Sequence, residues 1–364
     1  MKYRLKDIFD LQMGKTPSRS NPDYWNTKDN KWISIADLTK TEKYILDTKE
    51  YLSDVAIKES GIKIIPDNTV VMSFKLSIGK TAITKEQMYS NEAIMAFHDK
   101  HIVDILPEYI FYLFKYRNWD EDSNKAVKGK TLNKATLSEI EVEICAIEKQ
   151  REIVAVLDKM TFLLESRKTE IELLDDLVRA RFVELFGDRY INDRKWNTIE
   201  LADSISFNNG KAHEQVVDET GEYILVTSKA IASDFTDVRK TNVLLFPLHK
   251  NDIVMVMSDV PNGKALAKCQ LIDEDSKYTL NQRICSFDNY EYNPVFLLHL
   301  LNRHPYFLSF NDGNGQTNLR KNDILRCELI VPPLELQNQF AAFVTQVDKS
   351  KFSVFNTINI LFNI

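Results

Sequence analysis

An internal repeat limits the folds that this chain can adopt. Its opening residues recur at an offset of 196: Leu5, Asp7, Gly14 and Lys15 correspond to Leu201, Asp203, Gly210 and Lys211. Four further pairs follow at offsets of 184, 190, 186 and 187: Gly79-Lys80 with Gly263-Lys264, Asn91 with Asn281, Gly129-Lys130-Thr131 with Gly315-Gln316-Thr317, and Glu148-x-Gln150 with Glu335-x-Gln337. The offset changes only slightly, so the two copies differ by small insertions. The repeat predicts two related units of roughly 150 residues, each followed by a helix, in one polypeptide.

The bulk composition is that of a globular protein with two domains. The chain has 364 residues, of which 44% are hydrophobic and 27% are charged. No apolar run approaches the ~18 residues that a membrane helix needs. The first residues lack the apolar core of a signal peptide, and the four cysteines are scattered without a C-x-x-C pair. These features predict a cytoplasmic protein with reduced thiols and no membrane partner.

The net charge of −6 is distributed unevenly. Residues 1–147 hold 22 basic and 22 acidic residues, whereas residues 188–333 hold 16 basic and 20 acidic ones. An acidic total does not exclude nucleic acid, because only the local face of a protein meets the phosphates. It does predict that part of the electrostatic affinity comes from a partner.

Short apolar or alternating runs predict strands in both copies. The runs are 31–35, 69–74 and 93–97 in the first copy and 223–227, 252–257 and 283–287 in the second. In each copy a helix follows that begins at a proline, Pro107 or Pro294. Shorter strands are expected at 141–144 and 328–331. The sequence therefore predicts a mixed α/β fold.

Two long helices follow the two units, and their apolar residues alternate in steps of three and four. This spacing is typical of a coiled coil, although a narrow apolar stripe also fits a helix packed on a globule. The predicted seam consists of Ile153, Leu157, Met160, Leu164, Ile171, Leu174, Val178, Phe340, Val344, Val347, Val354, Ile358 and Leu361. The pseudo-symmetry favours an antiparallel pair. The expected domains are 1–147 and 188–333, with helices over 148–187 and 334–364.

Several motifs suggest chemistry, but none is complete. The sequence G-K-T occurs three times, yet the glycine that a phosphate-binding loop needs five residues earlier is replaced by Phe9, Phe74 and Asn124. Asn21-Pro22 and Asn293-Pro294 resemble part of an adenine methyltransferase motif, but they lack its second proline and are better interpreted as a turn or a helix start. No residues have metal-ligand spacing, and no catalytic set is expected.

Polar and basic residues in corresponding loops are the remaining candidates for a binding surface. Lysine and arginine neutralise phosphates, while asparagine, glutamine and arginine can read base edges. Solvated loops are the alternative interpretation. The DNA-binding candidates are Lys15, Lys75, Ser77, Lys80, Lys128, Lys130, Lys134, Lys211, Ser258, Asn262, Lys264, Gln316, Asn318, Arg320 and Lys321.

The order and duplication of these motifs make the chain resemble the specificity subunit of type I restriction–modification enzymes. The segment Ile330-Val-Pro-Pro-Leu-Glu-Leu-Gln-Asn-Gln-Phe340 carries much of the resemblance; the first copy has Cys145-Ala146 where the family pattern has Pro-Pro. The resemblance implies two globular target-recognition domains separated by two long antiparallel coiled-coil helices. Each domain would read one half of an asymmetric, bipartite double-stranded DNA target.

The resemblance also implies partners and cofactors. The chain would dock two methyltransferase subunits and, through them, restriction subunits. It would bind no cofactor itself, while the partner subunits would use S-adenosylmethionine, ATP and Mg²⁺. Two alternatives stay open: a self-sufficient DNA nuclease or methyltransferase, and a non-functional or donor-cassette subunit that acts only as a scaffold.

Overall fold

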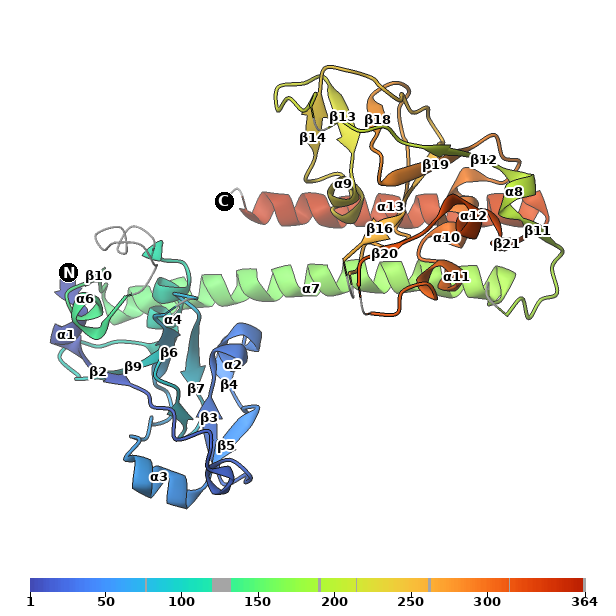
Figure 1. The fold of residues 1–364 in the computed structure, drawn as a ribbon. Helices are drawn as coiled ribbons and strands as arrows, with labels where there is room; N and C mark the ends of the chain where they lie inside the picture. The colour runs from blue at the N-terminus through green and yellow to red at the C-terminus, as the bar shows by residue number, and fades with distance from the viewer. Residues whose placement is uncertain are drawn as a thin grey trace. The chain divides into compact units, whose positions relative to one another are not determined.

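The computed structural model describes residues 1–75, 77–119, 132–188, 191–213, 215–260, 263–313 and 315–362, without the side chains of 358–362. The chain divides into two compact units, Met1–Leu164 and Glu165–Ile364, hereafter unit 1 and unit 2. The boundary falls inside the long helix α7 (Ile147–Phe186) (Figure 1). Each unit is a mixed α/β structure.

Unit 1 contains a five-stranded sheet. Its strands, in order across the sheet, are β2 (Phe9–Met13), β9 (Ile94–Asp99), β6 (Val70–Ser73), β7 (Thr81–Thr84) and β4 (Tyr44–Ile45). Neighbouring strands are antiparallel except for the β4–β7 pair. A smaller sheet has the order β5 (Glu50–Leu52), β3 (Asn30–Ile33) and β8 (Tyr89–Ser90), and a third pairs β1 (Lys2–Arg4) with β10 (Glu141–Glu143).

Short helices complete unit 1. They are α1 (Leu5–Ile8), a 3-10 turn η1 (Pro22–Tyr24), α2 (Ile35–Lys40), α3 (Asp54–Ser60), α4 (Pro107–Lys115) and α6 (Lys134–Ser138).

The large sheet of unit 1 is covered on both faces, which explains why its strands are continuous apolar runs. In β6, Val70 and Met72 pack into the same core as α4. The alternating residue Val71 packs on the opposite face, in a second core with Ile33 and Leu38. Residues that alternate along a strand point to opposite faces, so one apolar strand serves two cores.

Unit 2 repeats this plan. Its large sheet has the order β12 (Ser206–Asn209), β19 (Ile284–Asp288), β15 (Ile253–Val256) and β17 (Cys269–Leu271). Its small sheet has the order β14 (Arg239–Thr241), β13 (Tyr223–Val226) and β18 (Tyr278–Leu280). Two further pairs are β11 (Thr198–Glu200) with β21 (Glu328–Ile330), and β16 (Ser258–Asp259) with β20 (Thr317–Asn318). Again Ile253 belongs to one core and Val254 to the other.

Helices complete unit 2 as well. They are α8 (Leu201–Ser204), α9 (Ser228–Ala232), α10 (Pro294–Leu301), α11 (Pro305–Leu308), α12 (Lys321–Leu325) and the long α13 (Leu334–Phe362). The predicted proline-led helices are therefore α4 and α10. Asn293 caps α10 by accepting hydrogen bonds from the backbone N–H groups of Val295 and Phe296, which confirms the interpretation of Asn293-Pro294 as a helix start.

The repeated glutamine of each unit is buried and fastens the start of a long helix. The Gln150 side chain accepts a hydrogen bond from the Leu106 N–H and donates to the carbonyls of Asp104 and Cys145. Gln337 accepts from the Asn293 N–H and donates to the Pro332 carbonyl. Because a buried amide is costly unless it is bonded, this clamp explains the recurrence of Glu-x-Gln.

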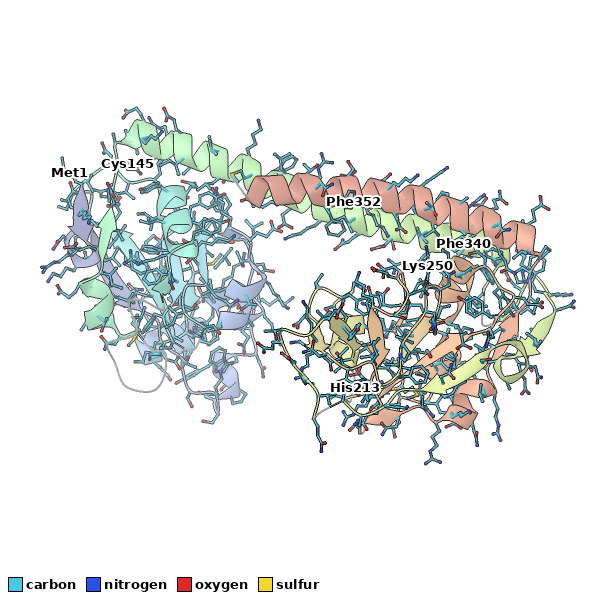
Figure 2. The ribbon with its side chains drawn as sticks, turned by 90° about the horizontal axis from the view of Figure 1, so that it is seen from above. Met1, Cys145, His213, Lys250, Phe340 and Phe352 are labelled. Carbon is cyan, nitrogen blue, oxygen red and sulfur yellow. The ribbon has the colours of Figure 1, made fainter. Side chains whose placement is uncertain are left out.

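Within unit 2, α13 packs antiparallel against the C-terminal half of α7. Figure 2 labels Phe340 on α13. Its ring lies edge-on to those of Phe182 and Phe186 on α7, with ring centroids 5.4 and 5.7 Å apart. Further along, Lys351 Nζ lies 2.6 Å from the Asp175 carboxylate. As the residue number rises on α13, it falls on α7, so the predicted antiparallel arrangement is found.

The seam residues have different surroundings in the two units. Leu174, Val178, Phe340, Val344 and Val347 pack into the large core of unit 2. Ile153 and Leu157 pack against the core of unit 1. Met160, Leu164 and Ile171 are half-buried and Val354 is buried, whereas Ile358 and Leu361 lie among the side chains that the structure does not describe.

Among the described residues, no helix is both long and apolar enough to cross a membrane. The four cysteines are free thiols, and three of them are buried.

Candidate nucleic-acid interface

Backbone hydrogen bonds bring the predicted groups of unit 1 to one end of its large sheet. There β2 ends, β9 begins and β6 ends. The Gly14 N–H donates to the Ile94 carbonyl, and the Phe74 N–H donates to the Ala93 carbonyl. The Leu132 N–H in turn donates to the Phe74 carbonyl. We call this region, where β2 and β6 end and β9 begins, the sheet end of unit 1.

The sheet end of unit 2 is built in the same way. The Gly210 N–H donates to the Ile284 carbonyl, and the Met257 N–H donates to the Arg283 carbonyl. The Leu319 N–H donates to the Met257 carbonyl. Loops that are far apart in the sequence therefore meet at the sheet end of each unit.

Two glycines of the repeat make this edge possible. A Cβ atom on Gly14 would lie 2.2 Å from the Asn91 carbonyl oxygen, and one on Gly210 would lie 2.0 Å from that of Asn281. Real Cβ atoms do not come so close to an oxygen, so only glycine fits. Gly14 and Gly210 therefore recur for close backbone packing, and not to hold phosphate.

The lysines that follow these glycines are exposed. The Lys15 ammonium donates to the Ser60 carbonyl, at the end of α3. The Lys211 backbone bonds to Leu280 and His213. Lys15 and Lys211 each lie just after the outer strand of the large sheet, β2 or β12.

On the other side of the unit 2 sheet end, the ribbon β16–β20 carries three candidates. Ser258 is paired with Asn318, and the Gln316 side-chain amide donates to Ser258 Oγ at 2.6 Å. Lys264 is exposed on the loop after β16. The Asp259 carboxylate holds this loop by accepting hydrogen bonds from the backbone N–H groups of Ala265 and Leu266. Strand pairing and side-chain hydrogen bonds therefore hold this polar ribbon in place.

Basic residues follow this ribbon. Arg320 and Lys321 are exposed at the start of α12, and the Lys321 ammonium lies 5.3 Å from the centre of the Phe207 ring.

The corresponding side of unit 1 is a hairpin between β6 and β7. Lys75 is half-buried with its ammonium 5.3 Å from the Phe74 ring centre. Ser77 is exposed, and the Lys80 N–H donates to Ser73 Oγ. Lys134 is the exposed first residue of α6. Lys128, Lys130 and Asn262 lie outside the described residues.

The electrostatics of the two sheet ends differ at corresponding positions. In unit 1, a hydrogen bond from Thr16 lowers the pKa of Glu92, and the positive charges of Lys75 and Arg19 act in the same direction. Unit 2 has Gln282 at this position. At this position unit 1 therefore has a carboxylate, whereas unit 2 has a neutral amide.

Sequence reasoning missed two sets of residues. Phe182 and Phe186 pack on Phe340, but they fall outside the predicted seam. In unit 1, Arg19 lies over the Trp25 ring at 3.8 Å from its centre and also bonds to Glu50. Aligning the two copies position by position would have shown such differences in charge.

No group of three or more potential metal ligands is present among the described residues. Each sheet end presents polar and basic side chains on a hydrogen-bonded backbone. Such a set can bind a polyanion and hydrogen-bond to base edges.

Comparison with known proteins decides the family. The model of the "Type I restriction modification DNA specificity domain" matches residues 1–174 and again 193–361. The chain belongs to this family. Each unit carries one copy of the domain.

Relatives agree with this assignment. The specificity subunit of the type I restriction enzyme MjaIX from Methanocaldococcus jannaschii is 30% identical over 51% of this chain and 43% of its own length. That of EcoR124I/EcoR124II from Escherichia coli is 27% identical over 51% of this chain and 46% of its own length. The matched part thus spans less than half of each of these relatives.

Solved structures share the fold. The S subunit of a type I restriction–modification system from M. genitalium superposes with a TM-score of 0.55 at 14% identity, covering 100% of this chain and 92% of the other. A chain from a study of complex assembly and conformational transition of the type I R-M system gives 0.61 at 14% identity, covering 100% and 94%. The named relatives and the M. genitalium chain are specificity subunits of type I systems.

Proposed function

We propose that this chain is the DNA-sequence-recognition subunit of a type I restriction–modification complex. It binds an asymmetric, bipartite double-stranded DNA target, and each unit reads one half with its sheet end. The chain docks methyltransferase subunits, which modify adenine with S-adenosylmethionine, and through them ATP- and Mg²⁺-dependent restriction subunits. It contributes recognition and no catalysis.

One observation carries the proposal: the DNA specificity domain occurs once in each unit, on the same backbone, but with different side chains at the sheet end. Glu92 and Ala93 of unit 1 correspond to Gln282 and Arg283 of unit 2. Base edges are distinguished by the donors and acceptors that face them. Two similar frames with different side chains therefore suit two different half-sites.

The test is to express the chain with its cognate methyltransferase subunit in a host without adenine methylation and to map N6-methyladenine. We expect one motif made of two separated half-sites. Substituting Gln316 and Asn318 with alanine should relax or change only the half read by unit 2. Lys240→Gln, on an exposed position of β14, is a control that should keep the whole motif.

Other outcomes identify the alternatives. Methylation by the isolated chain would show an enzyme, and a stable complex without sequence preference would show a scaffold. Loss of both half-sites in the Gln316→Ala, Asn318→Ala variant, with assembly intact, would contradict the assignment of one half-site to each unit.

A further inference from the structure

A hollow in unit 2 gathers basic side chains from three segments that are far apart in the sequence. It is lined by Lys229 at the start of α9, by Arg239 on β14, and by Gln282 and Arg283 just before β19. Arg283 also belongs to the sheet end, where its carbonyl bonds to the Met257 N–H. The hollow therefore adjoins the predicted recognition edge.

The two guanidinium groups of this hollow form no ion pair within the described part of the chain. Lys229 forms an ion pair with Asp237 at 2.6 Å. Neither the Arg239 nor the Arg283 side chain forms an ion pair or a hydrogen bond with another described residue. Both residues are exposed. Residues 188–333 carry a net negative charge, yet this hollow brings together two arginines that form no ion pair.

Unit 1 provides an internal control for this feature. In unit 2, Leu225 of β13 pairs with Thr279 of β18 and with Arg239 of β14. In unit 1, Trp32 of β3 pairs with Tyr89 of β8 and with Glu50 of β5. Because the two ladders correspond strand by strand, Arg239 occupies the position of Glu50.

The other two cations are replaced as well. Thr227 caps α9 and Ser34 caps α2, each just after the central strand of the small sheet, so Lys229 corresponds to Ala36. Arg283 corresponds to Ala93, since their carbonyls accept corresponding hydrogen bonds. The shared fold thus does not require any of the three cations. Their presence in one hollow of unit 2 is a separate property of that unit.

We propose that this hollow binds one phosphodiester of the DNA backbone, held by the guanidinium groups of Arg239 and Arg283. The inference rests on the proposed DNA-binding function and adds to it an anchoring contact in unit 2 that unit 1 lacks. Arginine presents a planar fork of donors that fits phosphate oxygens. A phosphate contact fixes the position of the protein on the duplex, while the neighbouring polar ribbon can read bases.

The salt dependence of binding tests this contact. The full chain, in complex with its cognate methyltransferase subunit, is titrated against a labelled duplex that contains its mapped target over a range of salt concentrations. Each neutralised phosphate contributes about −0.9 to the slope of log K against log[salt]. We expect the Arg239→Gln, Arg283→Gln double variant to lose about one unit of slope and on the order of tenfold in affinity.

The matched control is Lys240→Gln. Lys240 is the exposed neighbour of Arg239 on β14, and successive residues of a strand point to opposite faces. This variant should bind with the wild-type slope. Unchanged thermal unfolding of all variants would show that they are folded, as expected for exposed side chains.

Two results would overturn the inference while the proposed function stands. One is a double variant with the wild-type slope; the other is a loss of affinity confined to some sequences in a panel of duplexes, which would indicate base reading instead of a phosphate contact. If the wild-type complex binds no duplex at all, the proposed function itself is wrong.

Discussion

The sheet ends of the two units share a backbone and differ in charge. Gly14 and Gly210 make the same close approach to the chain, and three corresponding hydrogen bonds hold each edge together. On this frame, unit 1 places Glu92 where unit 2 places Gln282. The repeat therefore keeps the residues that shape the sheet end, while the side chains displayed there differ between the units.

The long helices show a second contrast. Phe340 and Ile153 occupy corresponding positions, three residues after the buried glutamine. Phe340 is fully buried between α7 and the core of unit 2, whereas Ile153 is half-buried against the core of unit 1.

Replacing Phe340 and Ile153 by alanine should lower the free energy of unfolding by unequal amounts. We expect Phe340→Ala to destabilise unit 2 by about 3–5 kcal/mol, as for a fully buried aromatic residue. Ile153→Ala should cost unit 1 roughly 1 kcal/mol, because a half-buried side chain loses less burial free energy. Hydrogen exchange measured peptide by peptide reports on each unit separately. Equal losses of protection in the two units would refute the contrast between the helices.

Removing the buried glutamines should, in contrast, affect both units alike. Gln150→Ala and Gln337→Ala each leave backbone groups without a partner, at a cost of about 1–3 kcal/mol. The measurement is again hydrogen exchange, at the starts of α4 and α10. Gln346→Ala is the control, because Gln346 is exposed on α13 and should tolerate the change. An effect in only one unit would show that the clamp is not shared.

Exchanging the charge at the sheet ends should change DNA affinity in opposite directions. Gln282→Glu places a carboxylate in the basic hollow of unit 2 and should weaken binding a few-fold at low salt. Glu92→Gln removes a carboxylate from unit 1 and should strengthen binding by a similar factor, since repulsion of phosphate is relieved. Titration of a labelled target duplex at two salt concentrations measures both. Changes of the same sign would contradict a role for local charge.

The smallest effect concerns pH and has opposite signs in the two units. The lowered pKa of Glu92 stabilises the folded state above the ordinary carboxyl value of 4.5, and this contribution is lost as the pH falls. In unit 2, burial raises the pKa of Asp252 above 3.8, so its carboxylate disfavours folding at neutral pH and protonation relieves the cost.

Thermal unfolding at about pH 5.5 and about pH 3.5 measures both contributions. As the pH falls, the melting temperature of the wild type minus that of Glu92→Gln should decrease. The corresponding difference for Asp252→Asn should increase. Parallel trends for the two variants would show that the pKa shifts do not act as described.

Local patterns in the sequence determined the repeat, the mixed α/β class, the proline-led helices and the antiparallel helix pair. Apolar strands, helix caps and heptad spacing act over a few residues, so they can be recognised without coordinates. The family resemblance rested on the same short motifs. The recurrence of Glu-x-Gln was visible too, but its clamping role depended on backbone groups more than 40 residues away.

Only the tertiary structure decided which residues meet. Lys211, Arg283 and Ser258 are far apart in the sequence and converge because β12, β19 and β15 are neighbours in one sheet. Likewise, only strand register shows that Arg239 of unit 2 occupies the position that Glu50 has in unit 1. Strand order and register are set by packing on both faces of the sheet, and no short-range pattern encodes them. The sequence thus determined two similar frames, while the fold determined which charges each frame displays.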